Sequence, residues 1–194
     1  MEQGESKRIR HQIYEHVNSG GFIMTVLEAI KGRYSVRSYL PASVSEEDLA
    51  AVLEAARFSQ SAKNIQNWRF VVVREESMRQ KLSAAAKGQR FVGEASVVIV
   101  CCGTSTDYIM TCGQAAYTIN VSIAMENMAL VAHERGLGTC WLGAFYENQV
   151  RSLVGIPGDD IRVVGMLTLG YPADKPRAKS RYPHDVIVNY ERWR

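Results

Sequence analysis

The sequence lacks the features that mark membrane-spanning and metal-binding proteins. No apolar run approaches the roughly 18 residues that a membrane-spanning helix needs, and the longest run, residues 95–102, has the length of a buried strand. The four cysteines show no CxxC pair and no other metal-ligand spacing, and the four histidines are scattered without an HExxH motif. We therefore expect no metal site, and we expect reduced, mostly buried thiols in a cytoplasmic protein.

Motifs for several enzyme classes are also missing. There is no Walker loop and no GxSxG nucleophile elbow. Gly136-Leu-Gly138 follows a long helical pattern and precedes a strand-like one, whereas a dinucleotide fingerprint requires its glycines between a strand and a helix. His133, near the end of the same helical pattern, is interpreted as a packing or carbonyl-capping residue. These absences leave no side-chain nucleophile or metal to carry the chemistry.

The charge balance excludes partners that need a strongly basic surface. The 23 Lys and Arg residues against 20 Asp and Glu residues leave a net charge of +3, and they form no continuous basic stripe. We therefore expect no nucleic acid and no membrane as a partner. With 194 residues, 46% of them hydrophobic, the chain is long enough for one domain with its own core.

Residue periodicity predicts an α+β protein. Helices are expected over residues 26–30, 45–57, 77–86 and 113–135, with a short one ending near residue 156. Strands are expected over residues 69–74, 96–102, 139–143 and 161–169, the first two of them buried. The 113–135 pattern is apolar on more than one face, which predicts extensive burial.

The two ends of the chain differ in composition from the middle. Residues 1–23 are polar and precede Met24, so we interpret them as an N-terminal extension that either is not native to the protein or lies on a neighbouring subunit. Residues 24–194 are interpreted as a single domain. Its last part, from residue 173, is basic and contains two of the five prolines, which favours an extended tail.

Two basic segments suggest an anion site. Arg33, Ser35 and Arg37 alternate along an extended segment, so their side chains share one face. Lys179 and Arg181 alternate in the same way in the tail. Guanidinium, ammonium and hydroxyl groups together suit a phosphate monoester, and the two segments could meet on one phosphate.

The loop of residues 59–68 carries two asparagines and two glutamines beside Trp68. Such a loop can bind the hydrogen-bonding edge of a planar heterocycle, or it can be a plain polar turn.

Five segments, in order, resemble the FMN-dependent nitroreductase family. They are Arg33-Tyr-Ser-Val-Arg37, Ser61-Ala-Lys-Asn64-Ile-Gln66-Asn67-Trp68, Gly136-Leu-Gly-Thr-Cys-Trp-Leu-Gly143, Leu169-Gly-Tyr-Pro172 and Lys179-Ser-Arg181. The match covers roughly residues 25–193. The resemblance implies a mostly antiparallel central sheet flanked by helices, in an intertwined homodimer whose FMN sites lie at the subunit interface and whose tails reach the partner.

The resemblance also implies roles for individual residues. Arg33, Ser35, Lys179 and Arg181 would hold the FMN phosphate, with Tyr34 among them, and Arg37 would lie by the flavin N1–C2=O edge. Ser61, Asn64 and Gln66 would come from the partner subunit, the backbone of Leu142 and Gly143 would face flavin N5, and Gln89 would touch the pyrimidine ring.

Two positions depart from the family pattern. Tyr34 stands where a second basic residue or a histidine is common, and Asn67 replaces the usual proline. The second departure predicts a looser flavin-facing loop.

The function implied is ping-pong hydride transfer from NADH or NADPH through FMN to nitroaromatics, quinones or similar small acceptors. Three alternatives remain at this point. One is a flavin-fragmenting enzyme like dimethylbenzimidazole synthase, and another is a reductive dehalogenase, for which residues 87–112 leave little room for a lid. The third is a non-catalytic flavin-binding or redox-sensing protein.

Overall fold

The computed structural model describes residues 24–193, so the expectation for residues 1–23 lies outside the described part of the chain. The helices are α2 (Val26–Gly32), α3 (Glu46–Arg57), the 3₁₀ helix η1 (Ala62–Asn64), α4 (Glu76–Ala85), α5 (Arg90–Glu94), α6 (Ala116–Glu134), α7 (Glu147–Val154) and α8 (His184–Ile187). The strands are β1 (Trp68–Val73), β2 (Val97–Gly103), β3 (Gly138–Leu142) and β4 (Arg162–Gly170). The predicted α+β class is confirmed.

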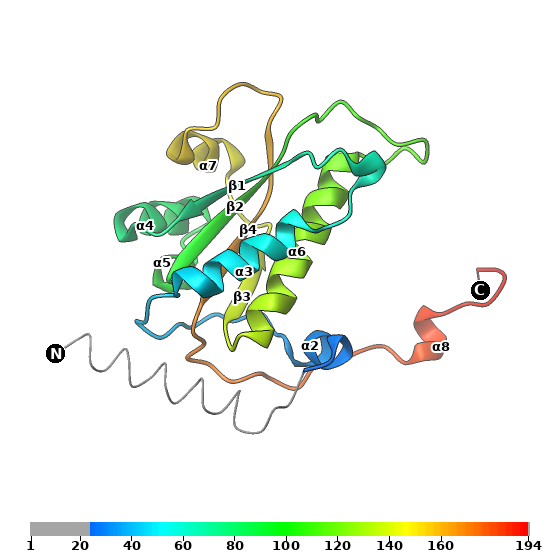
Figure 1. Ribbon diagram of the computed structural model, residues 1–194, viewed down its shortest axis with the longest axis horizontal. Coiled ribbons are helices and arrows are strands. Elements are labelled where there is room, and N and C mark those ends of the chain that lie inside the picture. Colours follow the sequence, from blue (N-terminus) through cyan, green and yellow to red (C-terminus); the bar gives the residue numbers. More distant parts are fainter. Residues whose placement is uncertain (1–23, 194) are drawn as a thin grey trace.

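The four strands form one sheet in the order β1-β2-β4-β3, and every pair of neighbouring strands is antiparallel. Helices cover both faces, as Figure 1 shows, with α3 and α6 crossing one face. Strand β2 is buried along its whole length between the two layers. Its odd-numbered residues join the core beneath α3 and α6, and its even-numbered residues join the core beneath α4 and α7, as the alternation of a strand requires.

Three sequence expectations need correction. The strand predicted at residues 69–74 is only partly buried, because β1 lies at an edge of the sheet. The long helix begins at Ala116 and not at residue 113, because the backbone of Met110 bonds to Gln114 and Gly113 in a turn before it. The short helix α5 was not predicted, since its five residues are too few to show a helical period.

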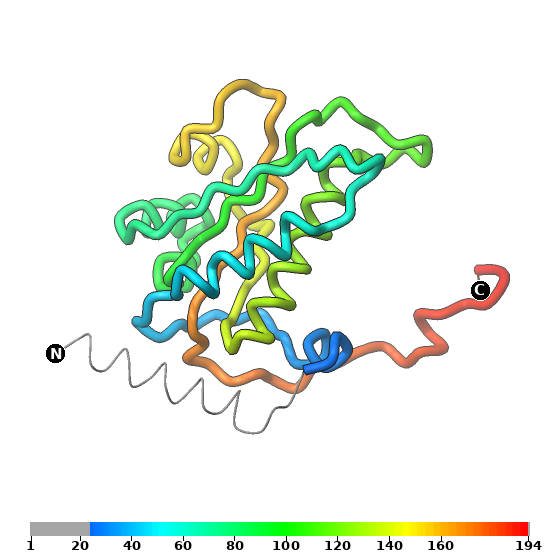
Figure 2. Tube along the Cα trace, in the orientation of Figure 1, coloured from blue at the N-terminus to red at the C-terminus, as the bar shows by residue number. Residues whose placement is uncertain are grey.

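The C-terminal segment leaves the body of the molecule. After β4 it passes beneath α2 and extends away with α8, as the tube trace in Figure 2 shows. Its large apolar side chains are exposed, namely Tyr182, Val186, Ile187, Tyr190 and Trp193. In one chain this arm therefore buries little apolar surface.

No helix within the described residues is both long and apolar enough to cross a membrane.

Candidate functional site

The first basic segment is fixed against β3 by backbone pairing and by a glycine. The Val36 amide donates to the Thr139 carbonyl at 2.9 Å, and Ser35 pairs with Thr139 in a parallel bridge. Gly138 permits this approach, because a Cβ there would overlap the fully buried Val36 side chain. With Val36 pointing inward, the alternating residues Ser35 and Arg37 turn the other way.

The basic tail returns to the same place. Backbone bonds join Leu40 to Tyr171 at 2.9 Å and Ala173 to Ser38 at 2.8 Å. Farther along the tail, the Lys179 ammonium donates to the backbone carbonyls of Lys31 and Arg33. Two segments about 140 residues apart in the sequence thus lie side by side.

Together they form a cavity of about 300 Å³, which we call the basic pocket. It is lined by Tyr34, Ser35, Arg37, Asp174, Lys175, Arg177, Ala178 and Lys179. Four of the predicted site residues are in this lining, and the backbone of Arg33 is bonded to one of them. The Arg181 guanidinium donates to the neighbouring Ser180 carbonyl at 2.7 Å.

The electrostatics of the basic pocket favour an anion. Burial and the nearby Arg33 and Arg181 cations lower the pKa of Lys179. The Nε of Arg33 is buried without a hydrogen-bond partner. An anion placed among these groups would relieve their repulsion and offer acceptors to their donors.

Asp174 is a site residue that the sequence did not reveal, since a single acid in a basic tail carries no distinctive pattern. Its Oδ2 accepts from the Arg37 amide at 3.1 Å, while its Oδ1 is buried without a partner. Its carbonyl accepts from the Tyr34 hydroxyl at 2.7 Å. Burial and Asp174 raise the pKa of Tyr34, so the hydroxyl stays a donor and fixes the tail to the first segment.

A second group of predicted residues lies at the far end of β3. Because residues 35–37 run parallel to β3, Arg37 is closer to this end than Arg33 is. Leu142 and Gly143 follow Thr139 by three and four residues, about 10–13 Å along a strand. The Gln89 side chain donates to the Ala144 carbonyl at 3.2 Å and to the Ala86 carbonyl at 2.9 Å, which places Gln89 beside this end.

The polar loop is not brought to these groups within one chain. Its Ala62 amide donates to Asn120, near the start of α6, whereas the basic segment adjoins His133, near the end of α6. His133 follows Asn120 by thirteen positions along the helix, about 20 Å at 1.5 Å per residue. Ser61, Asn64 and Gln66 therefore stay apart from the basic pocket of their own chain, as Figure 1 also shows for η1 and α2.

The loop is nevertheless well fixed, contrary to the expectation drawn from Asn67. Lys63, Asn64 and Gln66 all have positive φ, between 48° and 54°. The Gln66 amide donates to the Ser61 hydroxyl at 3.0 Å, and its side chain donates to Asn64 at 3.2 Å. Asn67 is buried and hydrogen-bonded, so the prediction that it loosens the loop is wrong.

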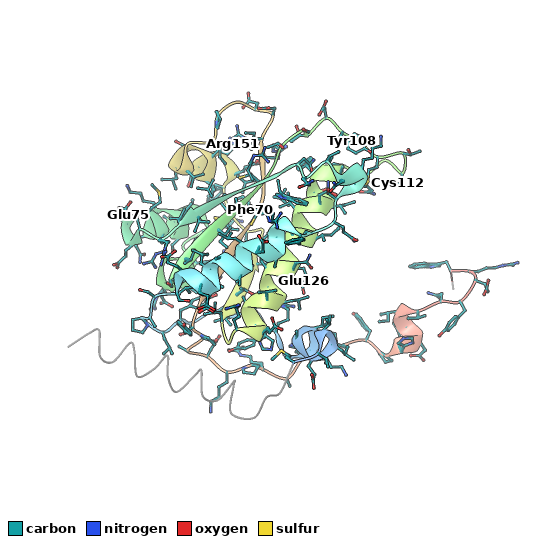
Figure 3. All side chains as sticks on the ribbon, in the orientation of Figure 1. Phe70, Glu75, Tyr108, Cys112, Glu126 and Arg151 are labelled. Carbon is teal, nitrogen blue, oxygen red and sulfur yellow. The ribbon has the colours of Figure 1, made fainter. Side chains whose placement is uncertain are left out.

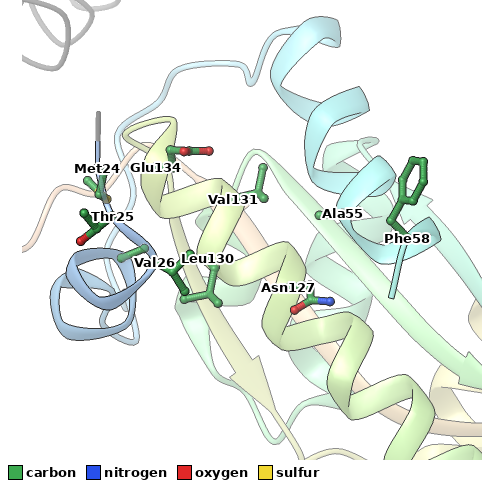
Figure 4. Close-up of a pocket in the computed structure, with 10 residues that line it drawn as sticks. Met24, Thr25, Val26, Ala55, Phe58, Asn127, Leu130, Val131 and Glu134 are labelled. Carbon is green, nitrogen blue, oxygen red and sulfur yellow. The ribbon is translucent and has the colours of Figure 1, made fainter. Parts of the chain in front are cut away.

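An apolar surface lies between the basic pocket and the polar loop. Figure 4 shows a cavity bordered by α2, α6 and the end of α3. Its volume is about 360 Å³. Val26 and Phe58 border it and are largely exposed. Ile119 of α6 is 38% exposed, so the extensive burial predicted for this helix is incomplete in one chain.

The remaining sequence expectations concern cysteine, histidine and metal. All four cysteines are free, and only Cys112 is exposed. Burial raises the pKa of Cys102 to about 11, so its thiol stays protonated. His133 packs against Gly32, as expected of a packing residue. Within residues 24–193, no group of three or more His, Cys, Asp or Glu residues has a metal-binding arrangement.

Comparison with known proteins decides the family. The chain matches the Nitroreductase family over residues 30–116 and 80–171. A relative from Methanothermobacter thermautotrophicus, whose name includes NAD(P)H nitroreductase, is 35% identical over 183 residues, covering 92% of this chain and 93% of the relative. The chain belongs to the nitroreductase family.

Other members of the nitroreductase family agree with this assignment. A solved nitroreductase family protein from Clostridium difficile 630 is 32% identical, with a TM-score of 0.77 over 88% of this chain and all of the other. A Bacillus subtilis (strain 168) protein named FMN reductase [NAD(P)H] is 26% identical over 183 residues, covering 86% of this chain and 73% of the relative. The predicted family and fold are thereby confirmed.

Proposed function

We propose that this chain is an FMN-dependent NAD(P)H oxidoreductase that reduces nitroaromatics, quinones or similar small acceptors. The observation that carries the proposal is the bond of Lys179 to the Arg33 carbonyl, which joins segments from opposite ends of the domain beside one cation-rich pocket, although the side chains of Arg33 and Arg181 are not part of its lining. The names of the relatives, which include NAD(P)H nitroreductase and FMN reductase, support this activity.

The residues present fit a flavin mononucleotide. The buried Arg33 Nε without a partner and the mutual repulsion of the Lys179 and Arg181 cations both suit a phosphate group. The Asp174 carboxylate accepts from the Arg37 amide through Oδ2, and its buried Oδ1 has no partner, so the surrounding cations must outweigh this acid when a phosphate binds. In the basic pocket, cations outnumber this one acid.

The order of residues along β3 suggests how the flavin would be oriented. The phosphate would lie by Arg33, Ser35, Lys179 and Arg181, and the ring would extend in the direction of β3. Arg37 would then stand near the ring edge, where its charge favours an anionic reduced flavin. The backbone of Leu142 and Gly143, with Gln89 beside it, would contact the flavin ring. Bound FMN would supply the redox chemistry, taking hydride from NAD(P)H and then passing it to an acceptor.

The site would be completed by a second copy of the chain. The apolar surface of Val26, Phe58 and Ile119 and the exposed arm of residues 182–193 are both explained if they are covered in a homodimer. A partner would bring its own Ser61, Asn64 and Gln66 to the flavin, which a single chain cannot do. Residues 24–194 would thus act as one domain whose tail reaches the partner.

The test is direct. Purified protein is titrated with FMN while flavin fluorescence is followed, and oxidation of NADH and NADPH is then measured with a quinone and a nitroaromatic acceptor. We expect one FMN per chain and turnover with at least one donor and acceptor. A protein that takes up no FMN, or that binds FMN without turnover of any acceptor, would overturn the proposal.

Lys179→Ala adds a test of the phosphate position. Charge-assisted hydrogen bonds contribute about 1.5–3 kcal/mol, so the variant should bind FMN at least tenfold more weakly. Lys81→Ala is the matched control, because Lys81 is an exposed lysine on α4, away from the basic pocket. Equal FMN affinity in the two variants would contradict the assignment of Lys179.

A further inference from the structure

A buried pair of asparagines connects the polar loop to two other elements. Asn67 at the start of β1 is 4% exposed, and Asn120 on α6 is 2% exposed. The Asn120 Nδ2 donates to the Asn67 Oδ1 at 2.8 Å. Two polar side chains of this kind are costly to bury unless their donors and acceptors are paired, and here the pairing is extensive.

Each amide also bonds outward from the pair. The Asn67 Nδ2 donates to the Thr104 carbonyl at 3.0 Å, just beyond the end of β2. The Asn120 Oδ1 accepts from the Ala62 amide at 3.0 Å, in the middle of the polar loop. The result is one continuous chain of hydrogen bonds from β2 through Asn67 and Asn120 to Ala62. These bonds fix the loop to α6 at Ala62, the first residue of η1.

The hydrogen bonds from Thr104 to Ala62 hold the part of the loop that carries the exposed residues Asn64 and Gln66. Asn64 and Gln66 have left-handed φ values of 54° and 48°; asparagine tolerates this region, whereas glutamine adopts it only at a cost in free energy. The 3₁₀ helix η1 is a single turn and includes the equally strained Lys63. An anchored Ala62 amide restrains the backbone directly before these residues. Figure 3 shows Tyr108 and Cys112 on the segment after β2, beside this loop and the start of α6.

We propose that Asn67 and Asn120 are positioning residues that hold Ser61, Asn64 and Gln66 in the conformation that contacts FMN in the partner subunit. The inference rests on the proposed function for the identity of the ligand. It assigns to Asn67 a task that proline, the residue of the family pattern at this position, cannot perform, because proline has no side-chain amide. The departure from the pattern is therefore paired with a second residue, Asn120.

The first measurement needs no flavin. Hydrogen exchange of the Ala62 amide is followed in the protein without added FMN, under conditions where each variant is fully folded by circular dichroism. Asn67→Ala and Asn120→Ala are each expected to speed exchange at Ala62 about tenfold or more, since each leaves a buried polar group unpaired. Unchanged exchange at Ala62 in Asn67→Ala would overturn the proposal.

The second measurement is the dissociation constant of FMN. We expect both variants to bind FMN at least several-fold more weakly than the wild-type protein. The double variant should be no worse than Asn120→Ala, because the two side chains belong to one chain of bonds and their effects are not additive. Faster exchange at Ala62 with unchanged FMN affinity would show that the loop does not act on FMN, and it would overturn the positioning role.

Asn127→Ala is the matched control. Asn127 is also an asparagine of α6, and its Nδ2 donates to Ser59 at 2.8 Å, at the base of the same loop. The variant loses one loop contact but leaves the hydrogen bonds from Thr104 to Ala62 intact, so exchange at Ala62 should stay at the wild-type rate. An equal acceleration of exchange at Ala62 in Asn127→Ala and Asn67→Ala would mean that any loop contact suffices, which also overturns the proposal.

A conservative variant provides a rescue. When its carboxyl group is protonated, Asn67→Asp has a donor and an acceptor where the amide has them. Its FMN affinity, relative to the wild-type protein at each pH, should therefore recover as the pH is lowered, whereas that of Asn67→Ala should not. Absence of recovery would count against the role of the side-chain pairing. A wild-type protein that binds no FMN would refute the proposed function, while exchange at Ala62 would still decide whether the pair anchors the loop.

Discussion

His133 shows how a single buried side chain can couple stability to pH. Its ring packs against Gly32 beneath the basic segment. Burial, Lys179 and Arg33 lower its pKa below the ordinary value of 6.5. The folded protein therefore holds fewer protons on this ring than the unfolded chain does at pH values just below 6.5.

The sign of the expected effect follows from that difference. Where the unfolded state binds more protons, the free energy of unfolding rises with pH, so the contribution of His133 is present above about pH 6.5 and is lost as the pH falls below that value. We expect His133→Gln to flatten the pH dependence of unfolding between about pH 5 and pH 7. Urea unfolding at both pH values measures it, and an unchanged slope in the variant would contradict the assignment.

Asn67 is the residue for which the sequence was misleading. Its type alone suggested a less rigid loop than proline would give. The structure places its side chain between Asn120 and Thr104, so it restrains the loop through bonds that no local pattern encodes. A residue's effect on rigidity depends on its partners, and these partners are 53 and 37 positions away in the sequence.

At the level of elements, the contact between the basic segment and β3 depends on Gly138. A Cβ at Gly138 would overlap Val36, so Gly138→Ala should lower the free energy of unfolding by about 1–3 kcal/mol. It should also weaken FMN binding, because Ser35 and Arg37 would move with Val36. Urea unfolding and FMN titration measure the two effects.

The matching change at Val36 is the control. Val36→Ala removes the methyl groups that the new Cβ would meet. We expect the double variant to lose less stability than the sum of the two single variants. Additive losses would mean that Gly138 is required for a reason other than its approach to Val36.

Helices and strands with clear hydrophobic periodicity or capping residues were predictable from the sequence. Their positions in the sheet and in the helical layers were not. Helix α3 was foreseen because Ser45 caps it and acidic residues fill its first turn, and Ser45 Oγ does accept from the Asp48 amide. β1 and β2 have similar compositions, yet β1 is an edge strand and β2 is central. Strand order is set by the packing of the whole sheet, so composition could not separate them.

At the level of the whole molecule, the exposed apolar surface predicts a dimer that is required for FMN binding. Ile119→Glu places a charge on the part of α6 that remains exposed in one chain. Burying that charge at an interface is costly, so the variant should be largely monomeric and should bind FMN poorly. Sedimentation velocity and FMN titration at equal protein concentration measure both properties.

Ala84→Glu is the control for this experiment. Ala84 is also exposed, but it lies on α4, in the helical layer on the other face of the sheet. Its substitution should leave the molecular mass in solution and the FMN affinity unchanged. If both variants behaved alike, or if Ile119→Glu stayed dimeric, the proposed interface would be wrong.

The sequence by itself determined the α+β class, most element bounds and the family. Capping residues, hydrophobic periodicity and the five ordered segments can each be recognised within a short stretch of sequence. It also predicted that the basic segments at residues 33–37 and 179–181 belong together, and the structure joins them through Lys179 and the Arg33 carbonyl. Only the tertiary structure decided that Asp174 lines this pocket, that the polar loop lies at the other end of α6, and that Asn67 is hydrogen-bonded to Asn120. Those facts depend on contacts between distant residues, and such contacts are fixed by the packing of the whole chain.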